Sequence, residues 1–368
     1  MTTVNLEILE NVPLAPLTTL GVGGQARFFV NAGSIDEVEQ ALRFASDRQL
    51  ELFILGGGSN VVISDRGFNG LVVRIAVCGI KERRIKRAAN ASIPPATTGN
   101  APEIVALDVG AGVDWDEFVA LSVSKNYGGV ECLSGIPGSV GGTPVQNVGA
   151  YGQEVSETIV SVLAYDLHER CVRELQNQDC GFSYRTSAFN STQRGRYIIL
   201  LVTYALQPGA RPVLRYADLE ELLQSNPTPT LAEVREAVLK IRARKGMVVN
   251  PDDPDSRSAG SFFKNPILSP EQFAQLEQET AARGLNVPRY PALSRQNKIS
   301  AAWLVENSGF YKGYSQGAVG ISNKHTLAIV NRGGATASEI VALRDEIQSR
   351  VEQAWGVRLD PEPVFVGF

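Results

Sequence analysis

Three consecutive glycines follow a short apolar run in the segment Ile54-Leu55-Gly56-Gly57-Gly58-Ser59-Asn60-Val61-Val62. The run Leu52-Phe53-Ile54-Leu55 predicts a buried strand that enters a tight glycine turn. Consecutive backbone N–H groups in such a turn form a nest that binds anions, and Ser59 and Asn60 add side-chain donors. The segment is therefore typical of a pyrophosphate site. A tight turn that binds nothing is the alternative, and the segment alone does not decide between the two.

A second glycine-rich segment, residues 128–152, contains Gly135-Ile136-Pro137-Gly138-Ser139-Val140-Gly141-Gly142 and Gln146-Asn147-Val148-Gly149-Ala150-Tyr151-Gly152. From Gly135 to Gly152 there is no charged residue and no helical periodicity, so we expect a loop and not a core strand. Glycines let a flat group lie against the backbone, and the backbone amides can bond a heterocycle. Two such loops on neighbouring units indicate one extended cofactor held between them.

The composition is that of an ordinary globular protein. The chain has 368 residues, of which 43% are hydrophobic and 20% are charged, and this length corresponds to two or three packed units. A net charge of −4 argues against a dedicated nucleic-acid binder, which normally carries a basic excess. The longest apolar run, residues 197–206, is about half the length that a bilayer requires. We therefore expect neither a nucleic-acid partner nor a membrane segment.

Cysteine and histidine usage predicts a cytoplasmic protein without a metal centre. The first residues lack the basic and apolar regions of a signal peptide. Two histidines are too few for a multi-histidine metal site. The cysteines show no CxxC or zinc-like spacing and predict reduced thiols: Cys78, Cys132, Cys171 and Cys180.

Strand and helix patterns alternate in the first part of the chain and turn mainly helical from Thr230. We expect strands at residues 27–30, 52–55, 71–73, 105–109, 158–167 and 197–206. We expect helices at residues 34–45, 114–126, 230–245, 269–284 and 338–354, two of them opened by the capping boxes Ser34/Glu37 and Thr230/Glu233. Residues 81–103 begin with a basic run and become rich in Pro, Thr and Asn, which predicts an exposed loop. A phosphate- or partner-binding role for the basic run is the alternative.

Common nucleotide-binding and hydrolase motifs are absent. The dinucleotide fingerprint G-x-G-x-x-G fails because Val61 and Trp115 occupy the third glycine position after Gly58 and Gly112. There is no G-x-x-x-x-G-K-[ST] phosphate loop and no G-x-S-x-G elbow, which argues against a P-loop enzyme and against a serine hydrolase.

Several motifs, in this order along the chain, resemble those of the UDP-N-acetylenolpyruvoylglucosamine reductase family. They are residues 56–60, 135–138 and 146–152, Phe182-Ser183-Tyr184-Arg185, Ala259-Gly260-Ser261-Phe262-Phe263-Lys264-Asn265-Pro266, and Leu359-Asp360-Pro361-Glu362. The similarity covers nearly the whole chain. It implies an α+β fold with a vanillyl-alcohol-oxidase-type FAD-binding domain of two α+β subdomains, residues 1–75 (rejoined by 357–368) and 76–228. A C-terminal α+β substrate-binding domain, residues 229–356, would follow.

The resemblance implies FAD and NADPH as cofactors. NADPH would reduce FAD, and FAD would pass hydride to the enolpyruvyl double bond of UDP-N-acetylglucosamine enolpyruvate, giving UDP-N-acetylmuramate for peptidoglycan precursor synthesis. No fingerprint in the sequence separates NADPH from NADH. The positions assigned to FAD lie in the two glycine segments and on one later strand: Ile54, Leu55, Gly56, Gly57, Gly58, Ser59, Asn60, Val61, Ile136, Pro137, Gly138, Val140, Gly141, Gly142, Thr143, Asn147, Gly149, Ala150, Tyr151 and Ile199.

Three residues match the catalytic positions of the family. Hydride delivery to an enolpyruvyl group builds negative charge on the adjacent carbon and its carboxylate, so the site must stabilise that charge and supply a proton. Ser261 matches the proton donor, Arg185 the arginine that bonds the enolate, and Glu362 a glutamate able to share a proton. Without the motifs, these residues would be interpreted as a turn cap, a surface ion pair and an exposed carboxylate. The assignment requires all three to converge.

Other residues match positions at the nucleotide sugar. Tyr216 matches a tyrosine that closes over the nucleotide sugar in one subgroup of the family. Lys245 and Asn265 match residues at the diphosphate or sugar, and Lys298 matches a further cation, which suits a diphosphate. Arg242, one turn before Lys245, either joins them or is an ordinary partner of the helix dipole.

Two other functions stay open on the sequence alone. An FAD-dependent oxidase of a sugar or alcohol would use the same fold. Many such oxidases attach FAD covalently through a histidine, and neither His168 nor His325 lies in a glycine segment, which argues against this function. A non-catalytic UDP-sugar binding protein would have no need to retain Arg185, Ser261 and Glu362 together. We expect a monomer by default.

Overall fold

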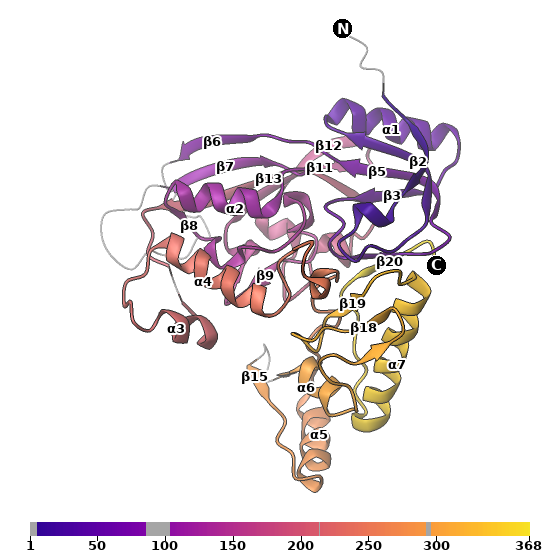
Figure 1. The fold of residues 1–368 in the computed structure, drawn as a ribbon. Helices are drawn as coiled ribbons and strands as arrows, with labels where there is room; N and C mark the ends of the chain where they lie inside the picture. Colours follow the sequence, from indigo (N-terminus) through magenta and orange to yellow (C-terminus); the bar gives the residue numbers. More distant parts are fainter. Residues whose placement is uncertain (1–5, 86–103, 213, 292–295) are drawn as a thin grey trace. The chain divides into compact units, whose positions relative to one another are not determined.

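The computed structural model describes residues 6–85, 104–212, 214–291 and 296–368, which group into two compact units (Figure 1). Unit 1 comprises Met1–Val12, Ala26–Gly58 and Asn69–Val248, and unit 2 comprises Pro13–Gln25, Ser59–Phe68 and Val249–Phe368. The boundary crosses the first glycine segment between Gly58 and Ser59. The three-part division implied by the family resemblance stays a prediction.

A four-stranded sheet and one helix form the first part of unit 1. The strands lie in the order β1 (Leu9–Pro13), β2 (Gln25–Ala32), β5 (Phe68–Ile75) and β3 (Leu52–Leu55), and β3 runs parallel to β5. Helix α1 (Ile35–Asp47) begins after Ser34, whose hydroxyl accepts the Glu37 N–H, and it buries Val38, Ala41 and Ala45. The predicted strands at 27–30, 52–55 and 71–73 and the predicted helix are confirmed.

A longer antiparallel sheet forms the second part of unit 1 (Figure 1). Its strands lie in the order β12 (Cys171–Gln176), β11 (Ile159–Asp166), β13 (Tyr197–Pro208), β7 (Ile104–Gly110) and β6 (Ile80–Ile85), and β8 (Tyr127–Gly128) also pairs with β13. Its three central strands confirm the predictions at 105–109, 158–167 and 197–206.

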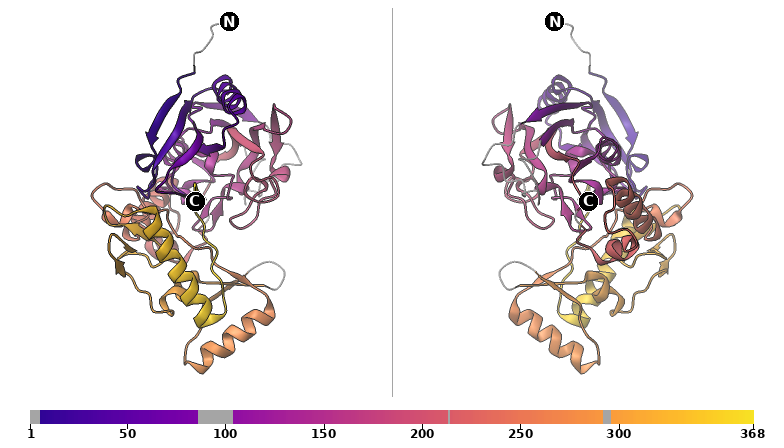
Figure 2. Two further views of the ribbon diagram at one scale, coloured as in Figure 1. Left: turned by 90° about the vertical axis from the view of Figure 1, so that its right-hand side faces the viewer. Right: turned by 90° about the vertical axis from the view of Figure 1, so that its left-hand side faces the viewer.

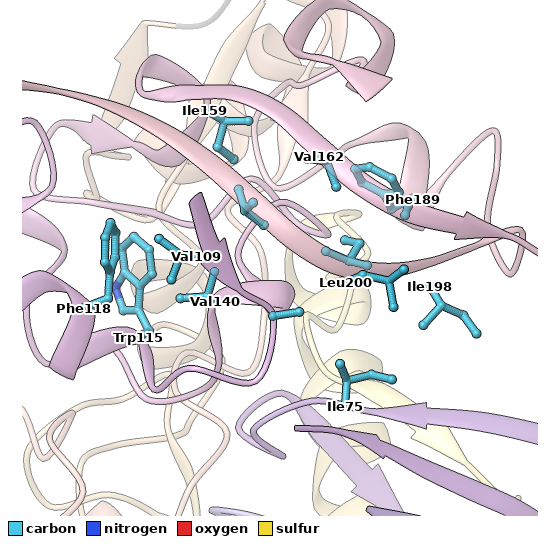
Figure 3. Packing of buried hydrophobic residues seen from close by; sticks show 14 of the residues in the cluster. Ile75, Val109, Trp115, Phe118, Val140, Ile159, Val162, Phe189, Ile198 and Leu200 are labelled. Carbon is cyan, nitrogen blue, oxygen red and sulfur yellow. The ribbon is translucent and has the colours of Figure 1, made fainter. Parts of the chain in front are cut away.

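The core of unit 1 lies between this sheet and helix α2 (Trp115–Ser124), as Figure 3 shows at Trp115, Phe118 and Val109. The rings of Trp115 and Phe118 are fully buried, and their centroids lie 5.5 Å apart. Val140, from the second glycine segment, is buried in the same cluster. The segment is thus anchored in the core at Val140, while Gly142 nearby is exposed.

Residues 80–85 differ from the sequence-based expectation, because they form edge strand β6 although an exposed loop is predicted from residue 81. Arg83 makes a two-pronged ion pair with Asp108 of β7, at 2.6 and 2.8 Å, which adds to the strand pairing. Local composition does not reveal this strand, since its partner lies further along the chain. The rest of the predicted loop, residues 86–103, lies outside the described residues.

Helix α4 and several short elements complete unit 1. Helix α4 (Leu231–Arg244) opens with the predicted reciprocal capping box between Thr230 and Glu233 and ends at Lys245. The remaining elements are α3 (Ala217–Leu223), β9 (Gly149–Ala150), β10 (Gln153–Glu154), and the 3₁₀ helices η2 (Glu131–Leu133), η3 (Val140–Gly142), η4 (Val155–Glu157), η5 (Asn177–Cys180) and η6 (Ala188–Asn190).

Unit 2 combines small sheets with helices, and α5 and α7 are the longest helices in the described residues of this unit (Figure 2). The helices are η1 (Ala15–Leu17), η7 (Pro254–Ser256), α5 (Pro270–Ala282), α6 (Ala301–Glu306) and α7 (Ala337–Trp355). The sheets are β4 (Val61–Ile63) parallel to β20 (Val364–Val366); β14 (Ile267–Leu268), β16 (Asn297–Ile299) and β15 (Arg289–Pro291); and β17 (Ser315–Gln316), β18 (Val319–Ile321) and β19 (Ile329–Asn331). Helices α5 and α7 confirm the predictions at 269–284 and 338–354.

Three properties of the described ranges bear on function. Every helix there is too short or too polar to span a bilayer. No group of three or more His, Cys, Asp or Glu side chains in those ranges is arranged to hold a metal ion. The four cysteines are free thiols.

Asp65 caps helix α7 from a distant part of unit 2. Its carboxylate accepts the N–H groups of Ala337 and Ser338, at 2.7 and 2.9 Å, and the Ser338 hydroxyl at 2.6 Å. Burial would raise the pKa of Asp65, but these hydrogen bonds hold its pKa below the ordinary value. The carboxylate therefore stabilises the folded state in its charged form.

We expect Asp65→Asn to lower the free energy of unfolding by about 1 kcal/mol, because the amide removes a negative charge from the helix N-terminus and one of the two acceptor oxygens. Because the folded pKa lies below the unfolded one, the wild-type advantage is present above the unfolded pKa of about 3.9 and is lost as pH falls through the folded pKa. Urea unfolding of both proteins at neutral and acidic pH measures this, with the exposed Asp252→Asn as control. An Asp65→Asn effect that is the same at both pH values contradicts the account.

Candidate active site

The first glycine turn lies directly against the second glycine segment within unit 1. A Cβ atom on Gly57 would lie 2.5 Å from Gly138 Cα and 2.7 Å from the Ser139 nitrogen, closer than real side chains come to backbone. Only glycine permits this approach, so the backbone groups of both segments stand next to one another without an intervening side chain. The two segments that the sequence analysis identified form one wall.

A polar pocket opens where these segments meet in unit 1. Arg74, exposed on β5, is the cation of its lining. A guanidinium beside glycine backbone is suited to bind a phosphate group. Sequence reasoning missed Arg74 because it is a lone charge in an apolar strand, far along the chain from Gly138. The lining consists of Gly56, Gly57, Arg74, Ile75, Gly112, Asp114, Gly138 and Ser139.

The first turn of α2 fastens the second glycine segment. The backbone N–H of Trp115 donates to Gly138 O at 3.0 Å, and its indole N–H donates to Leu133 O at 3.0 Å. The hydroxyl groups of Thr143 and Tyr204 lie 2.7 Å apart in the core. The pocket wall is therefore held by the same residues that fill the core.

The predicted substrate residues Tyr216 and Lys245 lie together in unit 1, beside Tyr151. The Tyr151 and Tyr216 rings meet edge to face with centroids 5.3 Å apart, and Lys245 Nζ lies 6.0 Å from the Tyr216 ring centre. Lys245 also forms an ion pair with Asp218 at 3.0 Å. Burial would lower the pKa of Lys245, but the bond to Asp218 and the nearby Tyr151 raise its pKa above the ordinary value. Lys245 is therefore protonated and positively charged at neutral pH.

Arg242 lies in the same region and is more enclosed than a solvated partner of the helix dipole. Its Nη2 donates to Met247 O at 2.8 Å, whereas its buried Nε has no hydrogen-bond partner among the described residues. Burial lowers the pKa of Arg242, and the nearby Tyr151 and Asp116 partly offset this shift. A buried N–H without a partner costs free energy, which a bound anion would recover. This favours the substrate role over the dipole role.

The Arg185 side chain contacts the second glycine segment within unit 1. Its Nη2 donates to Gly149 O at 2.7 Å, and its guanidinium carbon lies 5.4 Å from the Tyr184 ring centre. Asn147, two residues before Gly149, donates to Ser183 O at 3.1 Å. These contacts join the arginine motif to the segment that the sequence assigns to FAD.

Backbone pairing brings Ser261 next to Glu362 in unit 2. The Glu362 N–H donates to Phe262 O at 2.9 Å, and the Lys264 N–H donates to Asp360 O at 2.9 Å. The Asn60 side-chain amide donates to Glu362 O at 3.2 Å. Residues from three separate motifs therefore lie together.

His325 contacts the predicted proton donor. Its Nε2 lies 3.2 Å from Ser261 Oγ, within hydrogen-bond distance. Sequence reasoning missed His325 because no local motif surrounds it, and its signal is this tertiary contact. The Ser261 hydroxyl thus has an imidazole partner and does not cap a helix.

The other two predicted substrate residues lie on neighbouring elements of unit 2. The Asn265 side-chain oxygen accepts the Ala301 N–H at 2.9 Å, at the start of α6. Lys298 lies on β16, paired with Ile267 of β14 and Tyr290 of β15. Asn265 therefore has a structural contact beside its predicted role.

Two family models match this chain. One, described as an FAD binding domain, matches residues 26–167. The other, described as the C-terminal domain of UDP-N-acetylenolpyruvoylglucosamine reductase, matches residues 252–366. The first range contains both glycine segments and Arg74. The structure fits FAD there, because glycine backbone of both segments and the guanidinium of Arg74 line one polar pocket.

We expect Gly57→Ala to lower the amount of FAD that the purified protein retains. The added methyl group must push the two segments apart, and overpacking of this kind costs about 1–3 kcal/mol. Flavin absorbance per mole of protein measures the loss. Gly33→Ala is the control, because the nearest atom to its added methyl, Glu37 Oε2, lies at 3.5 Å. A full flavin complement in Gly57→Ala contradicts the account.

Relatives that are all named UDP-N-acetylenolpyruvoylglucosamine reductase match nearly the whole chain. The UDP-N-acetylenolpyruvoylglucosamine reductase of Thermobifida fusca is 45% identical over 97% of this chain and 98% of its own length. That of Mycobacterium tuberculosis is 41% identical over 98% and 95%. The crystal structure of the same reductase from Thermus caldophilus covers 98% of this chain and 99% of its own, with a TM-score of 0.60 and 23% identity, which supports the predicted α+β fold. The chain belongs to the UDP-N-acetylenolpyruvoylglucosamine reductase family of FAD-dependent oxidoreductases.

Proposed function

We propose that the chain reduces the enolpyruvyl double bond of UDP-N-acetylglucosamine enolpyruvate to UDP-N-acetylmuramate, with NADPH as the hydride source, in peptidoglycan precursor synthesis. The observation that carries this proposal is the placement of Ser261 beside Glu362 in unit 2, with Ser261 Oγ 3.2 Å from His325 Nε2. Reduction of an enol ether needs a proton donor next to a charge-stabilising group. Binding a UDP-sugar without chemistry needs neither.

Bound in the pocket that Gly57, Gly138 and Arg74 line, FAD would supply the redox chemistry, which is hydride transfer from NADPH to the methylene carbon of the substrate. The residues of the chain complete the reaction. The Ser261 hydroxyl gives a proton to the neighbouring substrate carbon, which carries the electron pair left by the broken π bond. A hydroxyl is a weak acid, but an enolate carbon is a strong proton acceptor. The contact with His325 holds the hydroxyl in one place for this transfer.

The negative charge that develops on the substrate carboxylate needs a cation and a proton source nearby. We assign the cation to Arg185 and the shared proton to Glu362. A guanidinium presents two parallel donors to a carboxylate, which a lysine does not. The assignment of Arg185 and Glu362 rests on their sequence motifs and stays a proposal.

The diphosphate and sugar are assigned first to residues at the end of α4 in unit 1. Lys245 and Arg242 offer a cation and a buried donor at the end of α4, and Tyr216 stands beside Lys245. The substrate roles of Asn265 and Lys298 rest on their sequence motifs and stay proposals. Anion binding would satisfy the buried Arg242 Nε, which supports the assignment.

Nicotinamide cofactor and sugar are proposed to use one pocket in turn, so we expect ping-pong kinetics. The helices of the described ranges give no membrane span. We place the protein in the cytoplasm, where NADPH and the UDP-sugar are made, and propose that it acts as a monomer.

We expect Ser261→Ala to separate the two halves of the reaction. Without oxygen, NADPH bleaches the visible flavin absorbance of the variant as in the wild type, because the serine takes no part in that step. Added UDP-N-acetylglucosamine enolpyruvate then reoxidises the variant at least about 100-fold more slowly, since general acid catalysis contributes about 10²–10⁴-fold. Stopped-flow absorbance measures both steps.

The control for this experiment is Ser46→Ala on the exposed face of α1, which should reoxidise at the wild-type rate. Equal reoxidation of Ser261→Ala and wild type would refute the role of Ser261. A wild-type flavin that NADPH bleaches but this substrate does not reoxidise would refute the proposed reaction. Oxygen uptake with a sugar or alcohol would then favour an oxidase, and a colourless protein would favour a UDP-sugar binder.

A further inference from the structure

A single carboxylate, Asp116, joins the second glycine segment to helix α4 inside unit 1. Asp116 follows Trp115 in the first turn of α2. Its Oδ1 accepts the Gly135 N–H at 2.5 Å and Arg235 Nη1 at 2.6 Å, and its Oδ2 accepts Arg235 Nη2 at 2.8 Å. Arg235 belongs to α4 and is only 17% exposed. Three elements therefore meet at one carboxyl group.

The Asp116 contact is charged and has a fixed direction. Burial would raise the pKa of Asp116, but the hydrogen bonds from Arg235 and Gly135, with the charges of Arg235 and Arg242, hold its pKa below the ordinary value. A two-pronged arginine–carboxylate pair also fixes the orientation of both groups. The link therefore resists rotation of α4 relative to α2.

Gly135 is enclosed by α4 on its other side. Its φ is +71°, and a Cβ atom would lie 2.7 Å from Leu239 Cδ2 and 3.5 Å from Arg242 Nε. The backbone of the glycine segment thus rests on α4 close to Arg242, while its N–H is held by Asp116. A shift of the segment away from α4 must break the Asp116 contact or open this packing.

This inference rests on the proposed function, in which the two elements that Asp116 joins bind different ligands. The second glycine segment binds FAD, and helix α4 binds the sugar nucleotide. The residues after Gly135 reach Gly138, which contacts Gly57 at the FAD pocket. Helix α4 continues from Arg235 to Arg242 and Lys245, which are assigned to the diphosphate of the sugar nucleotide. Trp115, the neighbour of Asp116, donates to Gly138 O and so ties the same turn to the FAD pocket.

We propose that Asp116 is a positioning residue that couples the FAD-binding glycine segment to the UDP-binding end of α4. Each ligand stabilises the bound position of the element that it contacts. Because Asp116 joins the two elements, this also stabilises the binding-competent position of the other element. Such coupling is reciprocal, so FAD and the UDP-sugar each raise the affinity of the protein for the other by the same factor.

The first test asks whether the link exists. Hydrogen exchange of the full chain, followed by mass spectrometry, compares wild type with Asp116→Asn, Arg235→Gln and Glu117→Gln. Glu117 is the next carboxylate of the same turn and is exposed, so its variant removes an equal charge from the N-terminus of α2. We expect faster exchange both near Gly135 and along α4 in the first two variants, and wild-type exchange in Glu117→Gln. Faster exchange near Gly135 alone would overturn the link.

The second test asks whether the link couples the ligands. The FAD dissociation constant is measured with and without saturating UDP-N-acetylmuramate. We expect the nucleotide sugar to tighten FAD binding about fivefold or more in the wild type and in Glu117→Gln, and the factor to fall toward one in Asp116→Asn. Substitution of a residue that only supports stability would change the FAD dissociation constants with and without the nucleotide sugar by the same factor, so their ratio would stay unchanged. An unchanged ratio in Asp116→Asn overturns the proposal, as does a wild-type ratio of one.

A third variant keeps the test decisive if Asp116→Asn does not fold. Arg235→Lys retains the positive charge but loses the two-pronged contact, so it should show the same fall in the coupling factor.

Wild-type protein that binds no FAD, or is not reoxidised by UDP-N-acetylglucosamine enolpyruvate, would refute the proposed function. Wild-type protein that passes both checks but shows the same coupling as the variants would refute only the role of Asp116.

Discussion

The contact between Gly57 and Gly138 is the constraint on which the cofactor region of unit 1 depends. It holds two segments that are far apart in sequence at a separation that excludes even a methyl group. Two sets of forces maintain it. The parallel pairing of β3 with β5 delivers the first segment to this point, and the hydrogen bond from Trp115 to Gly138 O holds the second. Glycine backbone near an arginine is the result, and this combination suits an anionic cofactor.

Unit 2 places its chemical groups by backbone pairing as well. The parallel pairing of β4 with β20 lays the C-terminal residues beside the continuation of the first glycine segment. The hydrogen bond from the Glu362 N–H to Phe262 O then sets this motif next to Ser261. Because main-chain bonds fix these positions, each side chain needs only a suitable rotamer to face a ligand. The contact of Ser261 with His325 is one such case.

Local signals in the sequence predicted most of the secondary structure. The capping box at Thr230 and the apolar stripe of α7 are complete within their own segments, so a reader of the sequence can find them. Strand β6 was missed because its stabilising partner, Asp108, lies outside the segment. The two glycine segments and the serine, arginine and glutamate motifs were found from sequence as separate features. Arg74 and His325 were not, because only long-range pairing gives them their neighbours.

We propose that the paired glycine segments, with Arg74, hold the pyrophosphate of FAD. A crystal structure of the full chain with FAD bound tests this most directly. The account predicts the pyrophosphate against the backbone of Gly56, Gly57 and Gly138, within hydrogen-bond distance of the Arg74 guanidinium, with Gly57 still in contact with Gly138. A pyrophosphate bound elsewhere on the chain, or glycine segments that part to admit it, would contradict the account.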